Sequence, residues 1–179
     1  MIKEKNKELM RKIFRILLVL LVIGLVFSLY VDYNLRRYSI WYAQHMPHSK
    51  DSDPVLVMTV KNIKWINKPN IVELENYTYD LDGNPQIYVD INEDHIVTLS
   101  SDDGVWVINN ENGEEIHYSF GKNGQMDWES NVKENVTEKE EQKGRDLVYS
   151  IIQPYIDNSW YPILNLQFIF NTVYYDQFN

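Results

Sequence analysis

An apolar run near the N-terminus constrains the fold of this chain most. Residues 16–31, ILLVLLVIGLVFSLYV, contain no charged side chain and follow a segment that carries six lysine and arginine residues. A helix needs about 20 apolar residues to cross a bilayer, and Ile13 and Phe14 extend the run because the long side chain of Arg15 can reach the interface. The sequence therefore predicts one transmembrane helix over residues 13–31, preceded by a short basic segment at 1–12.

The distribution of charge predicts the orientation of this helix. Lysine and arginine collect in cytoplasmic segments, and only Arg36 and Arg37 follow the apolar run closely, so we expect a cytoplasmic N-terminus and an extracellular remainder. The alternative is a cleaved signal peptide, but cleavage requires small residues after the apolar region, where this chain has LYVDY at 29–33. The sequence favours an uncleaved signal anchor in the cell membrane.

The composition of the remaining chain excludes several classes of function. From residue 32 onward there are 24 acidic and 11 basic residues, a formal charge of −13, which opposes nucleic acid and favours a cationic partner. The absence of cysteine excludes disulfides, zinc-thiolate sites and thiol nucleophiles. It is also common in exported proteins of Gram-positive bacteria, which we take as the expected source.

The residues after the anchor predict a stalk and one α+β domain. Residues 32–53 are polar and contain HMPHSKDSDP with two prolines, which is typical of a stalk. Residues 54–179 predict an extracellular domain that is mostly an antiparallel β-meander, because short runs rich in Val, Ile, Tyr and Trp are bounded by turn residues. The predicted strands are at 54–66, 70–81, 86–91, 95–100, 104–109 and 114–121.

One main helix is predicted to pack on this sheet. Thr137 and Glu140 form a capping box, and the apolar residues that follow share one helical face as far as Pro154. The last segment, ILNLQFIFNTVYYDQFN, is either a strand or an amphipathic helix; its alternation of apolar and polar residues favours the strand.

No motif predicts a metal site. Asp80, Asp82 and Asn84 match the start of a calcium loop, but its sixth and twelfth positions hold Pro85 and Ile91, so a hairpin turn is the better interpretation. A second possibility combines His45 and His48 with Asp51, on a segment without rigid support. We expect no metal and no cofactor.

Catalytic motifs are likewise missing from the sequence. A histidine pair, His95 and His117, could meet across the sheet and support a hydrolase, although histidines in strands are more often surface residues. The sequence contains no nucleophile-elbow serine, phosphate-binding loop or metalloprotease helix. The chain is therefore predicted not to be an enzyme.

A docking surface is the predicted use of residues 95–120. Aromatic side chains serve as interface anchors, although most aromatics in a small sheet domain belong to its core. Trp65, Tyr88 and Trp128 are further aromatic candidates. The predicted partner-binding residues are Trp106, Asp102, Asp103, Glu111 and Tyr118.

The layout of the chain resembles the TipC-type immunity proteins of streptococci and related Firmicutes. The shared features are a basic N-terminus, one anchor helix, an acidic exterior domain rich in Tyr and Asn, and the segment LNLQFIFN at 164–171. The resemblance implies a membrane-anchored protein that neutralises a secreted LXG-type toxin acting on the lipid-linked cell-wall precursor. An accessory or sensor protein that binds a cell-wall component or a membrane protein is the alternative.

Overall fold

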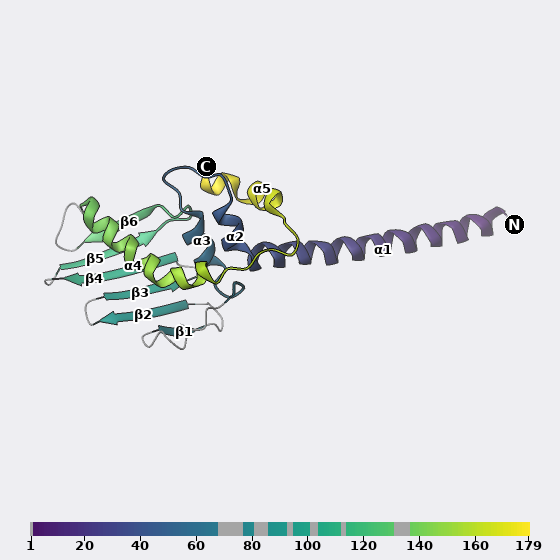
Figure 1. Cartoon of the computed structure of the whole chain (residues 1–179). Helices are drawn as coiled ribbons and strands as arrows, with labels where there is room; N and C mark the ends of the chain where they lie inside the picture. The colour runs from purple at the N-terminus through teal and green to yellow at the C-terminus, as the bar shows by residue number, and fades with distance from the viewer. Residues whose placement is uncertain are drawn as a thin grey trace.

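The computed structural model consists of a long helix joined to a folded domain (Figure 1). It describes the backbone of residues 2–67, 77–80, 86–92, 95–100, 104–111, 114–130 and 137–179, and the side chains of residues 7, 10–67, 119–127 and 137–179. The elements are α1(Ile2–Arg37), α2(Ser39–Gln44), α3(Pro54–Lys61), β1(Tyr77–Asp80), β2(Gln86–Asn92), β3(His95–Ser100), β4(Gly104–Glu111), β5(Glu114–Phe120), β6(Met126–Ser130), α4(Glu138–Asp157) and α5(Gln167–Phe178).

Helix α1 contains the predicted membrane segment. Its part from Met10 to Arg37 is long and apolar enough to cross a membrane, and none of its most apolar stretch is buried in the protein. Of the described helices it alone meets these criteria, which a membrane anchor and an N-terminal signal sequence both satisfy. The domain follows directly at its C-terminal end (Figure 1).

The predicted fold class is wrong. A mostly β domain with one main helix was expected, whereas helix accounts for 68% of the residues whose side chains are described, and only the facing ends of β5 and β6 contribute strand there. Within the described residues, α2, α3, α4 and α5 belong to the domain besides the end of α1. The cause is that two segments with strand-like patterns, 54–66 and 163–179, form helices.

Helix α3 occupies the first of these segments. Asp53 precedes it and accepts a hydrogen bond from the backbone of Leu56, while Pro54 takes the first helical turn, where a proline loses no hydrogen bond. The many β-branched residues of PVLVMTVK favour a strand only slightly. The cap at Asp53 and the burial of Leu56 and Met58 therefore favour a helix in this segment.

Helix α5 occupies the second segment. The alternation of apolar residues predicted a strand, but Phe170 donates its backbone hydrogen bond to Leu166, as a helix requires. Phe170 and Phe178 are buried on one face of α5, whereas Phe168 is exposed. The alternation therefore does not mark the buried positions.

The predicted stalk is also wrong, because residues 32–53 are packed into the domain. They form the end of α1, all of α2 and the connection to α3. Ile40 and Tyr42 of α2 are buried, and Asn34 of α1 is buried with them. The polar appearance of HMPHSKDSDP reflects a connection on the surface of the domain.

Helix α4 confirms the predicted main helix. The Thr137 side chain accepts a hydrogen bond from the Glu140 backbone, and the Glu140 carboxylate accepts one from the Thr137 backbone in return. The predicted apolar face is the buried one, with Pro154 inside the helix near its end. Helix α4 lies across the sheet and contacts β4 (Figure 1).

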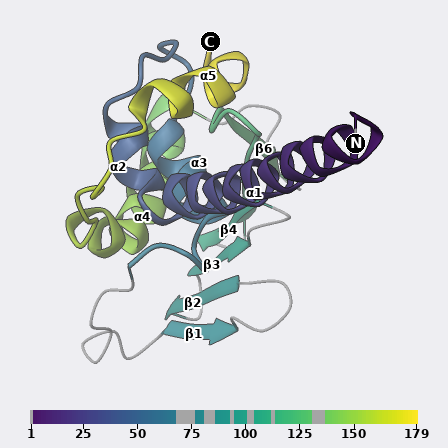
Figure 2. The same ribbon diagram turned by 90° about the vertical axis from the view of Figure 1, so that its right-hand side faces the viewer.

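The strands form one antiparallel sheet in chain order, β1 to β6. Strand β1 lies at one edge, and α5 lies at the opposite side of the domain (Figure 2). Two apolar clusters hold the helices in place. The first joins α2, α3 and α4 to Phe120 of β5, and the second joins the end of α1 to α2, α3 and α5.

Candidate functional site

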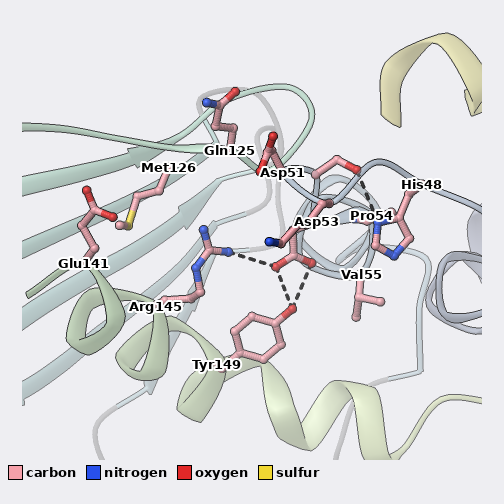
Figure 3. A pocket seen from close by; sticks show the side chains of 12 residues that line it. His48, Asp51, Asp53, Pro54, Val55, Gln125, Met126, Glu141, Arg145 and Tyr149 are labelled. Atoms are coloured by element: carbon pink, nitrogen blue, oxygen red, sulfur yellow. Dashed lines mark hydrogen bonds and ion pairs between the residues drawn. The ribbon is translucent and has the colours of Figure 1, made fainter. Parts of the chain in front are cut away.

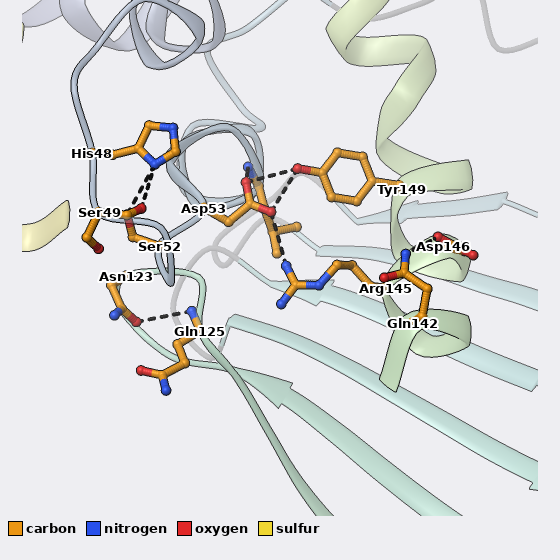
Figure 4. Close-up of polar contacts among 11 residues, drawn as sticks. His48, Ser49, Ser52, Asp53, Asn123, Gln125, Gln142, Arg145, Asp146 and Tyr149 are labelled. Atoms are coloured by element: carbon orange, nitrogen blue, oxygen red, sulfur yellow. Dashed lines mark hydrogen bonds and ion pairs between the residues drawn. The ribbon is translucent and has the colours of Figure 1, made fainter. Parts of the chain in front are cut away.

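Asp53 lies at the centre of a polar cluster between α3, α4 and the β5–β6 turn (Figures 3 and 4). One carboxylate oxygen, Oδ1, accepts from the backbone nitrogen of Leu56 at 3.1 Å and so caps α3. The hydroxyl of Tyr149 on α4 lies 2.9 Å from Oδ1 and 2.8 Å from Oδ2. Arg145, one turn earlier on α4, places Nη1 3.4 Å from Oδ2. We call Asp53, Arg145 and Tyr149 the Asp53 cluster.

The electrostatics of the Asp53 cluster keep Tyr149 protonated. Burial, followed by the neighbouring Asp53 carboxylate, raises the pKa of the Tyr149 hydroxyl, because both disfavour a phenolate. The Arg145 guanidinium acts in the opposite direction. Tyr149 is thus a hydrogen-bond donor to Asp53 across the neutral pH range. Both Asp53 oxygens thus accept hydrogen bonds from protein donors, and the carboxylate joins the start of α3 to α4.

The β5–β6 turn is fitted closely against Asp53. The Asp53 backbone donates to the carbonyl of Asn123 at 2.8 Å. Gly124 has φ 83°, and a Cβ at this position would lie 2.7 Å from the Asp53 Cβ and carbonyl oxygen. Glycine is required here for both its backbone angle and the close approach. The turn, α3 and α4 are thereby fixed relative to one another.

An open pocket of about 660 Å³ adjoins the Asp53 cluster (Figure 3). Its wall carries side chains of both charges, among them Lys50, Asp51, Glu141 and Arg145. Lys50 and Asp51 are exposed, and the Arg145 side chain is 34% exposed, so water and a partner can reach them. The pocket can accept a polar or charged group of a binding partner.

The proposed histidine metal site is not assembled. His45 Nδ1 lies 2.7 Å from the carbonyl of Trp41, and His48 Nδ1 lies 2.9 Å from the carbonyl of Ser49. Each histidine thus contacts its own segment of backbone. Within the part of the chain that the structure describes, no group of three or more His, Cys, Asp or Glu side chains is arranged to hold a metal ion.

A second polar network, the anchor junction, joins α1 to the domain. The Tyr42 hydroxyl lies 2.7 Å from Asn34 Oδ1 and 3.1 Å from the carbonyl of Leu164, and accepts from the backbone of Leu166 at 3.0 Å. Asn34 Nδ2 also donates to the Leu164 carbonyl at 3.3 Å. The Tyr42 ring stacks on Phe170, with centroids 5.2 Å apart. We define the anchor junction as Asn34, Tyr42, Leu164 and Leu166.

The two polar side chains of the anchor junction, Asn34 and Tyr42, are neutral and buried. Tyr42 has no exposed surface and Asn34 has 1%. Burial raises the pKa of Tyr42, although the hydrogen bond from Leu166 opposes this effect. Its polar atoms are paired, so the network satisfies the requirement that buried polar groups be hydrogen-bonded.

Three of the predicted docking residues lie in the described strands, Trp106 and Glu111 in β4 and Tyr118 in β5. Trp106 of β4 pairs with Ser119 of β5, whereas Tyr118 pairs with Val107, so Trp106 and Tyr118 are not cross-strand partners. Glu111 pairs with Glu114 at the end of the β4–β5 hairpin.

Asp102 and Asp103 fall outside the described residues, as do the side chains of the other three. This surface therefore stays a prediction.

The histidine pair considered for hydrolysis lies on strands that are not neighbours. His95 is on β3 and His117 is on β5, with β4 between them. On β4 their backbone partners are Asn109 and Ile108 respectively. Their side chains lie outside the described residues, so the geometry needed for catalysis stays untested.

Sequence reasoning missed the Asp53 cluster, although one local signal was present. Asp53 followed by Pro54 is the preferred order of a helix N-cap and first turn, which predicts a helix start inside the supposed stalk. The partners Arg145 and Tyr149 are more than 90 positions away, and no local pattern indicates them.

The aromatic candidate Trp65 is 39% exposed and packs edge-on against Tyr33 of α1.

Comparison with known proteins does not supply a family. No family model matches the chain, and neither a curated protein nor a solved structure matches it. The geometry of the pocket and of the anchor junction is therefore the basis for a functional proposal.

Proposed function

We propose that this chain is a single-pass membrane protein whose extracellular domain binds and neutralises a secreted antibacterial toxin at the membrane surface. The N-terminus is cytoplasmic in this proposal, and the domain acts by binding rather than catalysis. The observation that carries it is the anchor junction, which joins the apolar helix to the domain core without a flexible stalk. A domain attached in this way is restricted to the membrane surface, where a toxin directed at the cell envelope must act.

The packing at the end of α1 supports an uncleaved anchor. Val31, at the end of the apolar run, is partly buried against the second apolar cluster, and Leu35 belongs to that cluster. A signal peptide is normally removed without loss of core residues, whereas cleavage near residue 31 would disturb this core. The excess of basic residues before the helix supports the cytoplasmic N-terminus.

Charge and tethering support toxin capture. The formal charge of −13 beyond residue 31 favours encounter with a basic protein surface. Anchoring confines the inhibitor to the surface that the toxin must reach, which raises its effective concentration without any additional contact. The resemblance of the chain layout to the TipC-type immunity proteins supports the choice of a toxin as partner.

The direct test is capture with the full chain in lipid nanodiscs from the secreted proteins of the source organism. We expect one secreted protein to bind tightly, and to kill cells that lack this chain but spare cells that express it. Capture of cell-wall fragments or resident membrane proteins, with no toxic protein among them, would contradict the immunity function and support an accessory or sensor role.

Charge reversals then locate the binding surface. If the pocket is the contact site, Asp51→Lys should weaken capture several-fold, while Asp146→Lys, on an exposed part of α4 outside the pocket, should not. If the predicted turn at Asp102 and Asp103 is the contact site, changing both to Lys should slow association at low salt. Unchanged capture by Asp51→Lys removes the pocket from the proposal, and an unchanged association rate after the change at Asp102 and Asp103 removes that surface.

A further inference from the structure

The connection from α4 to α5 exposes an unusual amount of apolar surface. No charged residue occurs between Asp157 and Asp176, in a chain of which 24% is charged. Within this stretch Ile163 is 90% exposed, Phe168 82% and Tyr161 78%. Single exposed apolar side chains are common on proteins, but a continuous uncharged segment that exposes several of them indicates a contact surface.

This connection lies beside the end of the membrane helix. The Leu164 carbonyl accepts from Asn34, three residues after the apolar run of α1 ends. The Arg37 guanidinium lies over the Trp160 ring, 4.9 Å from its centroid. In Figure 1 the α4–α5 connection is the part of the domain that extends farthest along α1.

Aromatic residues of α1 and of the segment after α3 surround the same region. Tyr30 and Tyr33 of α1 are 39% and 49% exposed, and Tyr33 contacts Trp65 with ring centroids 6.4 Å apart. The Arg36 guanidinium also lies over the Trp65 ring, 5.8 Å from the ring centroid. Tyrosine and tryptophan with adjacent arginine are the residues that membrane proteins place at the lipid headgroups.

We infer that Tyr161, Ile163 and Phe168 insert into the interface of the membrane that α1 crosses, and form a second membrane contact. The occupant is the phospholipid bilayer, because the connection that exposes these side chains contacts Asn34 and Arg37 at the end of the apolar helix. A loop bonded to residue 34 cannot be far from the headgroups when residues 16–31 lie in the hydrocarbon. Insertion would fix both the tilt and the rotation of the domain on the membrane.

The contact is apolar rather than electrostatic. The uncharged connection offers no basic cluster to attract anionic lipids, and the acidic remainder of the chain opposes them. Insertion should therefore occur in bilayers of phosphatidylcholine alone and should be insensitive to salt. The inference requires only that α1 crosses a membrane, and does not depend on what the domain binds.

Spin labels at single cysteines test this inference, because the native chain contains no cysteine. The full chain is placed in phosphatidylcholine nanodiscs with a label at Tyr161→Cys, Ile163→Cys or Phe168→Cys. Gln142→Cys and Ser150→Cys on α4 serve as exposed controls. Collision rates with oxygen, which partitions into lipid, are compared with those of a water-soluble nickel chelate.

We expect the labels at 161 and 163 in the connection and at 168 in the first turn of α5 to collide at least several-fold more with oxygen than with nickel, relative to the two controls. Labels as accessible to nickel as the controls would overturn the inference. If they become protected only when a captured protein is added, the surface is a protein-binding site and the membrane contact is likewise overturned.

A substitution tests whether the apolar side chains drive insertion. Ile163→Asp combined with Phe168→Asp should move the label at position 161 into water, while the unfolding midpoint stays within error because both side chains are exposed. A label at 161 that remains in lipid would contradict a contact driven by these residues.

Discussion

The anchor junction and the Asp53 cluster both join distant segments of the chain, but they do so with different chemical groups. In each, one polar side chain connects segments that are far apart in the sequence. Tyr42 connects α1 to the start of α5, and Asp53 connects α3 to α4. The anchor junction contains only neutral groups, whereas the Asp53 cluster contains a carboxylate and a guanidinium.

The difference follows from access to water. Tyr42 has no exposed surface, and an ion at such a depth would require full compensation for its lost hydration. The side chains of Asp53 and Arg145 are 15% and 34% exposed, so their charges remain partly hydrated. A neutral network therefore suits the buried connection, and a charged network suits the side that faces solvent and the pocket.

The largest effect is expected at the anchor junction. Tyr42→Ala removes a buried ring that stacks on Phe170 and removes the hydroxyl that three groups share. We expect a loss of about 3–5 kcal/mol in the free energy of unfolding, measured by denaturant titration of the full chain in detergent.

Tyr42→Phe separates the ring from the hydroxyl. It should cost about 1–3 kcal/mol because Asn34 and the Leu166 backbone lose a buried partner. Tyr161→Phe, at a tyrosine that is 78% exposed, is the matched control and should change stability little. Equal effects of the two phenylalanine substitutions would contradict the role given to the Tyr42 hydroxyl.

At the Asp53 cluster, Asp53→Ala should cost about 2 kcal/mol, since it removes a helix cap and leaves the Tyr149 hydroxyl without its acceptor. Asp53→Asn retains a capping oxygen and should cost less, which distinguishes capping from charge. Thermal unfolding measures both, with Asp146→Ala on the exposed face of α4 as control. A loss of stability for Asp146→Ala as large as that for Asp53→Ala would contradict the role given to the Asp53 carboxylate.

Gly124→Ala tests the fit of the β5–β6 turn against Asp53. The positive φ and the short distances to Asp53 predict a loss of about 1–2 kcal/mol. Gly121→Ala in the same turn is the control, because its Cβ would meet only ordinary contacts at 3.6 Å. If both substitutions have the same effect, the close approach is not what requires glycine.

The smallest expected effect is a dependence of stability on alkaline pH. The pKa of Tyr149 is raised above its ordinary value of 10.0 by burial and by Asp53, so the folded state holds this proton more tightly than the unfolded state. The resulting stabilisation is present below pH 10 and is lost as pH rises above it. Tyr149→Phe should therefore be less stable at neutral pH and should lose less stability between pH 10 and 12. The measurement is the free energy of unfolding as a function of pH for the native chain and for Tyr149→Phe. Parallel curves for these two proteins would contradict the role given to the Tyr149 hydroxyl.

Local patterns predicted the elements whose signals are contained in a few neighbouring residues. The capping box of Thr137 and Glu140 and the apolar face after it correctly indicated α4. The apolar run indicated a helix long enough to cross a membrane. In both cases the residues that decide the structure lie within the element itself.

Elements decided by distant contacts were predicted wrongly. The alternation in LNLQFIFN resembles a strand, but α5 forms because Phe170 and Phe178 pack in the second apolar cluster with Tyr42. The anchor junction brings Asn34 and Tyr42 to residues more than 120 positions away, which no local pattern reveals. The stalk prediction depends on polarity and on two prolines, whereas the Asp53–Pro54 pair in the same segment is an N-cap signal for a helix.

The anchor junction predicts that the apolar helix α1 and the domain move as one body, and a distance measurement tests this most directly. Spin labels at Leu25→Cys on α1 and Ser150→Cys on α4, both exposed positions, report the distance between anchor and domain in the full chain in nanodiscs by pulsed electron paramagnetic resonance. We predict one narrow distance distribution that broadens in Tyr42→Ala. A broad distribution in the native chain would show that the domain hangs on a flexible stalk, and would contradict the account.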